Sequence, residues 1–148
     1  MRRALLTRGD RVGVVATAFA APPDALGAGV AALERRGFLP VLFPHLLAVD
    51  GYLAGDDAAR AHDLDAAVND SALSAIWFAR GGYGTARILD RIDLARLVED
   101  PKLLIGYSRV EIAGARRVVP RKIAVDRAHV LSEEGDQAAP FERGETGV

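Results

Sequence analysis

The stretch Ala75-Ile76-Trp77-Phe78-Ala79-Arg80-Gly81-Gly82-Tyr83-Gly84 joins a short apolar run to a turn rich in glycine. An apolar run of about five residues that is bounded by turn signals is typical of a buried strand. Three similar runs occur at residues 11–16, 38–43 and 102–106. Because these runs lack polar alternation, they predict strands of a parallel sheet that is covered on both faces.

Segments with helical periodicity separate these runs. Residues 24–36 and 57–69 each place apolar side chains at helical spacing on one face: Leu26, Val30 and Leu33 in the first, Ala61, Leu64 and Val68 in the second. Gly37 follows the first segment as its expected C-cap. Two shorter helices are expected at 84–90 and 93–99. Strands that alternate with helices predict an α/β fold, a mostly parallel sheet flanked by helices that is Rossmann-like.

The composition is that of one ordinary globular domain, with 148 residues, 50% of them hydrophobic. The formal net charge of -1 does not favour a nucleic-acid partner. The longest uncharged run, residues 37–49, has 13 residues, too few for a membrane span. Met1, Arg2 and Arg3 before an apolar stretch are compatible with a signal peptide, but Asp10 among the basic residues favours a first buried strand instead.

Charge is unevenly distributed along the chain. Residues 109–148 carry 14 charged residues in 40 positions, against 25 in the first 108. This later segment shows no sustained strand or helix period. We therefore expect an α/β domain at 1–108 and an atypical charged tail at 109–148 that is poorly structured.

The glycine turn at 80–84 is the first candidate site. In a parallel sheet, ligands bind at the carboxyl ends of the strands, and glycines there let backbone N–H groups approach an anion closely. Arg80 adds a positive charge beside the turn. The alternative is a tight connection that needs glycine only for its positive φ. A dinucleotide site is not indicated, because no G-x-G-x-x-G follows the first strand.

Ser108 is the second candidate, because Gly106-Tyr107-Ser108 ends the last apolar run as a nucleophile elbow does. Val110 stands where that motif has its closing glycine, and the alternative role for Ser108 is a helix N-cap. A serine nucleophile needs an adjacent base, usually histidine. The chain has three histidines, His45, His62 and His129, and no pair has metal-ligand spacing. We therefore expect no metal and no cofactor.

In combination, these segments resemble the N-terminal domain of the LD-carboxypeptidases. The resemblance covers roughly residues 8–108, and the ordered set of motifs is more specific than any one of them. The motifs that carry it are Arg8 to Ala16, Gly51-Tyr52-Leu53-Ala54-Gly55, Arg60 with Asp63-Leu64 and Ala67, Ala75 to Gly84, and Ile105-Gly106-Tyr107-Ser108.

The resemblance implies a cytoplasmic serine peptidase with a Ser-Glu-His triad that removes the terminal D-amino acid from murein tetrapeptides during peptidoglycan recycling. Ser108 matches the nucleophile. Backbone N–H groups of Gly82 and Arg109 match the oxyanion hole. Substrate contacts are expected at the rest of the glycine turn: Arg80, Gly81 and Tyr83. A murein peptide is the expected partner, without nucleic acid or membrane, and a homodimer is left open.

The chain departs from the family after Ser108. The family has Asp after the nucleophile, whereas Arg109 follows here, and the family's Glu and His belong to a separate C-terminal domain, beyond position 148. No residue of this chain matches either of those two. We therefore expect a truncated carboxypeptidase domain, lacking the C-terminal domain, that is inactive alone. The alternative is a noncatalytic α/β module that binds a small anionic peptide or ligand.

Overall fold

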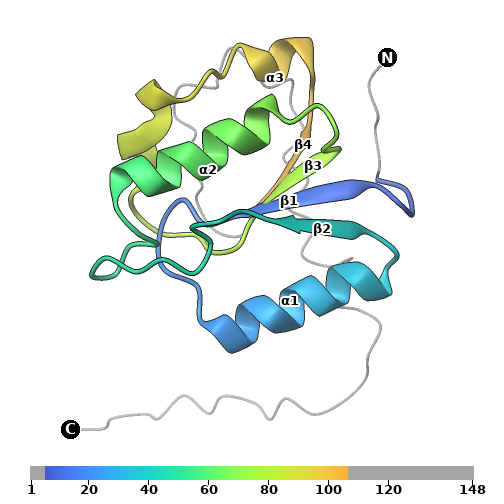
Figure 1. Cartoon of the computed structure of the whole chain (residues 1–148), viewed down its shortest axis with the longest axis horizontal. Coiled ribbons are helices and arrows are strands. Elements are labelled where there is room, and N and C mark those ends of the chain that lie inside the picture. The colour runs from blue at the N-terminus through green and yellow to red at the C-terminus, as the bar shows by residue number, and fades with distance from the viewer. Residues whose placement is uncertain (1–5, 107–148) are drawn as a thin grey trace, which may run out of the picture.

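The computed structural model describes residues 6–106, and these form a four-stranded parallel sheet with helices on both faces (Figure 1). The strands are β1 (Arg11–Val15), β2 (Leu39–Leu42), β3 (Ala75–Phe78) and β4 (Leu103–Ile105), in the order β2-β1-β3-β4. Each strand lies within one of the four predicted apolar runs. The α/β fold with a parallel sheet is confirmed.

The register of the sheet places β1 and β3 at its centre. Val14 of β1 is opposite Leu42 of β2 and Trp77 of β3, and Trp77 is in turn opposite Ile105 of β4. The central strands are largely buried, which explains why their sequences are continuously apolar.

Helix α1 (Pro23–Arg35) covers one face of the sheet. Gly37 ends it in a Schellman arrangement: its N–H donates to the carbonyl of Glu34 at 2.8 Å, and the N–H of Phe38 donates to that of Leu33 at 3.1 Å. The φ of Gly37 is +82°, as its position after the helix requires. The predicted stop signal is thus confirmed.

Helix α2 (Asp57–Asn69) covers the opposite face (Figure 1). The Asp56 carboxylate caps it by accepting the N–H of Ala59 at 2.7 Å. The buried residues of α2 include Ala61, Leu64 and Val68, which pack with residues of β1 and β3 in the larger of two apolar clusters. The smaller cluster lies on the side of α1.

Two short helical segments connect β3 to β4. The segment η1 (Thr85–Arg91) is a 3-10 helix, and α3 (Arg96–Glu99) is a single turn. Both were expected as helices; η1 begins after Gly84, whose φ of +118° only glycine adopts without strain. Among residues 6–106, no helix combines the length and the apolar character that crossing a membrane requires.

The expected boundary between a domain at 1–108 and a tail at 109–148 falls beyond Gly106, outside the part that the structure describes. That division of the chain stays a prediction.

Candidate functional site

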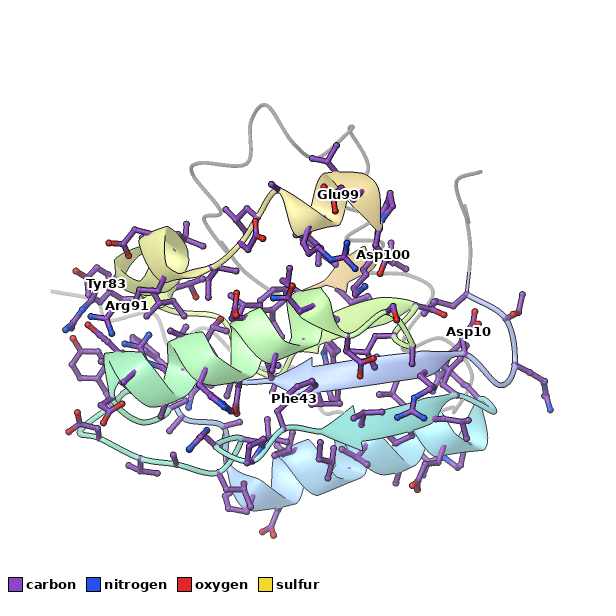
Figure 2. The ribbon with its side chains drawn as sticks, turned by 45° about the horizontal axis from the view of Figure 1, so that its top comes forward. Asp10, Phe43, Tyr83, Arg91, Glu99 and Asp100 are labelled. Atoms are coloured by element: carbon purple, nitrogen blue, oxygen red, sulfur yellow. The ribbon has the colours of Figure 1, made fainter. Side chains whose placement is uncertain are left out.

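The order of the strands places a topological switch point, where successive connections leave the sheet in opposite directions, between β1 and β3. The chain leaves β1 toward β2 on one side and leaves β3 toward β4 on the other. In open parallel sheets, ligands bind beside the carboxyl ends of the strands at such a point. The glycine turn follows β3 directly, and Figure 2 shows Tyr83 of this turn at one end of the molecule and Asp10, before β1, at the other.

Gly82 lies against an aromatic ring from the loop after β1. A β carbon at position 82 would lie 2.6 Å from Cγ of Phe19 and 2.7 Å and 2.8 Å from its two Cδ atoms, closer than packing allows. The φ of Gly82 is +128°, and that of Gly84 is +118°. Two independent constraints, backbone conformation and contact with a ring, therefore require glycine at position 82.

The side chain of Arg60 in α2 forms hydrogen bonds with three loops at the carboxyl edge of the sheet. Its side chain is fully buried, with 0% of its surface exposed. Its Nη1 donates to the carbonyls of Thr17 at 2.7 Å and Gly84 at 2.9 Å, and its Nε donates to that of Gly55 at 3.1 Å. These three carbonyls belong to the loops that follow β1, β3 and β2. One guanidinium group thus holds the glycine turn against both neighbouring loops.

The charge of Arg60 is balanced by Asp57, one turn earlier in α2. Nη2 of Arg60 donates to Oδ1 of Asp57, and Arg87 of η1 donates to Oδ2 of the same carboxylate at 2.9 Å. Burial lowers the pKa of Arg60 from its ordinary value, while the Asp57 carboxylate acts in the opposite direction. An arginine remains protonated at neutral pH under such opposing effects, so the guanidinium keeps all of its donors.

A second link joins the loop after β1 to the start of η1. The hydroxyl groups of Thr17 and Thr85 are 2.9 Å apart, and both residues are buried. The backbone of the same loop also pairs with the loop after β2, because Ala54 N–H donates to the carbonyl of Ala18 at 2.9 Å. The three loops at this edge therefore form one hydrogen-bonded unit.

Aromatic side chains border the glycine turn. The rings of Phe19 and Tyr52 meet edge to face with centroids 5.1 Å apart, and the guanidinium of Arg80 lies 5.8 Å from the centroid of Phe19. Tyr52 and Tyr83 are 59% and 61% exposed. Two tyrosine side chains are thus exposed to solvent in this region, one in the glycine turn and one in the loop after β2.

Four of the six predicted site residues are consecutive in sequence and lie within the part that the structure describes. Gly81, Gly82 and Tyr83 form the turn after β3, and Arg80 precedes them with its Nη1 donating to the carbonyl of Ala20 at 2.6 Å. The other two, Ser108 and Arg109, lie outside the described residues. Their place at the site and the roles of all six residues remain predictions.

Three residues of this edge were not predicted to have a role: Thr17, Phe19 and Arg60. For Arg60, the sequence does contain a signal. Positions 60, 64, 67 and 68 share one helical face, so Arg60 lies among apolar residues that the sheet covers, and a buried arginine must be paired. Phe19 has no comparable signal, because its contact with Gly82 depends on the topology of the sheet.

Asp63, on the buried face of α2, binds the loop after β2 through His45. Its Oδ2 accepts the backbone N–H of His45 at 2.8 Å, and its Oδ1 lies 2.8 Å from Nδ1 of the same residue. His62, which the sequence places on a solvated helix face, has a side chain that is 64% exposed, and its Nδ1 lies 3.3 Å from Oδ1 of Asp63. The spacing of the histidines did not predict this cluster.

One protein-family profile matches most of the chain. The profile of the LD-carboxypeptidase N-terminal domain matches residues 12–112, which include β2, β3, β4 and all of β1 except Arg11, together with the loops at the carboxyl edge of the sheet and Ser108. This match confirms the resemblance that the motifs indicated.

Known relatives agree with this match. The murein tetrapeptide carboxypeptidase of Pseudomonas aeruginosa is 37% identical over 103 residues, which are 69% of this chain and 34% of that protein. A probable murein peptide carboxypeptidase of Bacillus subtilis is 38% identical over 105 residues, covering 71% of this chain and 33% of the relative. The chain therefore spans about a third of the length of the curated relatives it matches.

A solved structure shares the fold. The microcin C7 self-immunity protein MccF, in complex with aspartyl sulfamoyl adenosine, matches with a TM-score of 0.65 and 27% identity. The match covers 70% of this chain and 32% of MccF. Both kinds of comparison therefore cover about a third of longer proteins.

Proposed function

The chain belongs to the LD-carboxypeptidase family, and from this premise we propose that it carries the nucleophile and the oxyanion-binding turn of a serine-type murein peptide carboxypeptidase. The observation that supports this most strongly is the glycine turn at the switch point of the sheet, within the segment that matches the family. The substrate is a murein tetrapeptide, and the bond that is hydrolysed precedes its terminal D-amino acid.

The proposed chemistry is acyl transfer through Ser108. Its Oγ attacks the carbonyl carbon of the scissile amide, a general base takes the hydroxyl proton, and the D-amino acid leaves as its nitrogen accepts a proton. Water then hydrolyses the acyl-enzyme and regenerates Ser108. Backbone N–H groups of Gly82 and Arg109 stabilise the developing oxyanion, and such a donor contributes about 3 kcal/mol to the transition state.

The neighbours of the glycine turn support its role as a rigid cradle. Arg60 fixes the carbonyl of Gly84, and the ring of Phe19 packs against Gly82. Oxyanion donors are effective because they are oriented before the reaction begins. Arg60 and Phe19 are thus positioning residues, which act on the substrate only through the turn.

Arg80 and Tyr83 are proposed to contact the peptide. Arg80 uses one N–H for the carbonyl of Ala20, and the guanidinium has further donors that can form a paired interaction with a carboxylate. Tyr83, in the same turn, is exposed and offers a hydroxyl and an aromatic face. The terminal carboxylate and the acidic side chains of a murein peptide are suitable partners for these groups.

The general base and its orienting carboxylate are not identifiable in this chain. Removing triad members lowers the rate by about 10³ to 10⁶. We therefore propose that residues 1–148 alone release the D-amino acid at or near the background rate. The proposal also includes action in the cytoplasm, where peptides from the cell wall are recycled. A homodimer stays a prediction, which sedimentation equilibrium tests.

Binding by the chain itself tests the proposed substrate. Amide chemical shifts are recorded by NMR as a murein tetrapeptide that ends in D-alanine is added, with the same peptide ending in L-alanine as a control. We expect shifts at Gly81, Gly82 and Gly84, smaller ones with the L-alanine peptide, and none at Gly9 before β1. Shifts that spare the turn would contradict the proposal.

The variant Arg80→Ala separates the contribution of the arginine from that of the backbone. It is expected to weaken tetrapeptide binding by about tenfold, in keeping with a charged hydrogen bond worth about 1.5 kcal/mol. Binding at the turn, without catalysis when the remaining part of a related carboxypeptidase is supplied, would favour the alternative of a noncatalytic binding module.

A further inference from the structure

His45, His62 and Asp63 form a second cluster of chemically active side chains, at a distance in sequence from the glycine turn. His45 lies in the loop after β2, whereas His62 and Asp63 are neighbours in α2. One ligand atom from each of the three residues can be chosen so that all three lie within 4.8 Å of one another. The rings of His45 and His62 meet edge to face, with centroids 5.4 Å apart.

The carboxylate of this cluster is fixed in place. Asp63 is only 2% exposed, and its Oδ2 accepts the backbone N–H of His45. This bond leaves Oδ1 directed at both rings, 2.8 Å from Nδ1 of His45 and 3.3 Å from Nδ1 of His62. Hydrogen bonds to the second oxygen of a ligating carboxylate are the usual way in which proteins orient metal ligands.

The two imidazoles remain accessible from solvent. The side chains of His45 and His62 are 40% and 64% exposed. A site with two histidines and one carboxylate provides three ligands of the kind that zinc and related transition-metal ions prefer, and it leaves a position for water. A tetrahedral ion with bonds of about 2.0 Å separates its ligand atoms by about 3.3 Å.

We propose that His45, His62 and Asp63 bind a divalent transition-metal ion of the zinc class, with water completing the coordination. In the metal-bound form, the ion takes the place of the hydrogen between Nδ1 of each imidazole and Oδ1 of Asp63, and each neutral ring carries its proton on Nε2, which faces water. The ring of His62, exposed on the helix, rotates to complete the site. Bound metal also links the loop after β2 to α2, so it stabilises the folded chain.

Equilibrium dialysis and calorimetry with zinc chloride test this site, after the chain has been freed of metal with a chelator. We expect one Zn²⁺ per chain and a higher melting temperature with zinc, whereas Mg²⁺, which requires oxygen ligands, has no effect. His62→Ala removes one of three ligands on an exposed face and is expected to weaken zinc binding at least tenfold. His45→Ala should do the same.

His129→Ala is the matched control, because it removes the third histidine of the chain and leaves the cluster intact. It is expected to bind zinc as the unchanged chain does. In NMR spectra, zinc should shift the imidazole signals of His45 and His62 and leave that of His129 in place. The absence of zinc binding, or full binding by the His45→Ala/His62→Ala double variant, would overturn the proposal. Neither result would affect the proposed role of Ser108.

Discussion

Gly82 and Phe19 are in such close contact that a β carbon at position 82 would lie 2.6 Å from the aromatic ring. The two residues belong to different loops, one after β3 and one after β1, so their contact joins the two loops at the switch point of the sheet. The shape of the proposed oxyanion turn therefore depends on a residue 63 positions away in sequence.

Gly82→Ala is expected to destabilise the chain by about 3 kcal/mol, because overpacking against Phe19 adds to the strain of a positive φ. Gly51→Ala is the matched control: its φ of +61° is also left-handed, but nothing lies within 4 Å of its β carbon. It should cost about 1 kcal/mol. Urea denaturation measures both. Equal losses would show that the Phe19 contact has no energetic effect.

Combining Gly82→Ala with Phe19→Ala tests the same contact independently. When the ring is absent, the added methyl group meets no obstacle from Phe19, and the cost of Gly82→Ala should fall to the part that its positive φ alone accounts for. Residues in contact show such nonadditivity, whereas independent sites are additive. A cost of Gly82→Ala that is unchanged in the Phe19→Ala background would contradict direct contact.

Arg60→Met is expected to lower the free energy of unfolding by at least about 3 kcal/mol, because three carbonyl groups lose a buried donor. Arg87→Met provides the control, since Arg87 binds the same Asp57 carboxylate through a side chain that is 47% exposed. An exposed pair of this kind contributes less than about 1 kcal/mol. Similar urea midpoints for the two variants would show that the three hydrogen bonds of Arg60 to the loop carbonyls do not stabilise the fold more than the exposed pair of Arg87 does.

Replacing each of two glycines of α1 by alanine should change the free energy of unfolding in opposite directions. Gly27 is exposed with no atom within 4 Å of its β-carbon position, so Gly27→Ala should stabilise the helix by about 0.5–1 kcal/mol. A β carbon at Gly29 would overlap the ring of Trp77 of β3, so Gly29→Ala should destabilise the chain by about 1–3 kcal/mol. Thermal melting distinguishes them. Stabilisation by both would mean that α1 does not pack closely on Trp77.

The elements of the fold could be predicted because each has a local signal. Strands buried on both faces are continuously apolar, and Asp56 and Gly37 mark the start of α2 and the end of α1. The connection from β3 to β4 is less regular: helices at 84–90 and 93–99 were expected, and the structure has a 3-10 helix and a single α-helical turn. Short segments carry little periodicity, so their type and length are poorly determined by sequence.

The candidate site was only partly predictable for a different reason. The glycine turn was identified because its glycines and Arg80 are consecutive in sequence. The contacts of Arg60 with Thr17, Gly55 and Gly84 join segments that are up to 43 positions apart, and only the order of the strands brings them together. The same holds for His45 and Asp63, which are 18 positions apart.

A chimeric enzyme tests whether Ser108 is the nucleophile. Residues 1–108 of this chain replace the matching N-terminal part of the murein tetrapeptide carboxypeptidase of Pseudomonas aeruginosa, whose remaining part supplies the rest of the enzyme. Release of D-alanine from a murein tetrapeptide is then measured. We expect release by the chimera and a loss of at least about 10³-fold in its Ser108→Ala variant. Equal release by both proteins, or none by a chimera that folds and binds the tetrapeptide, would contradict the assignment of Ser108 as the nucleophile.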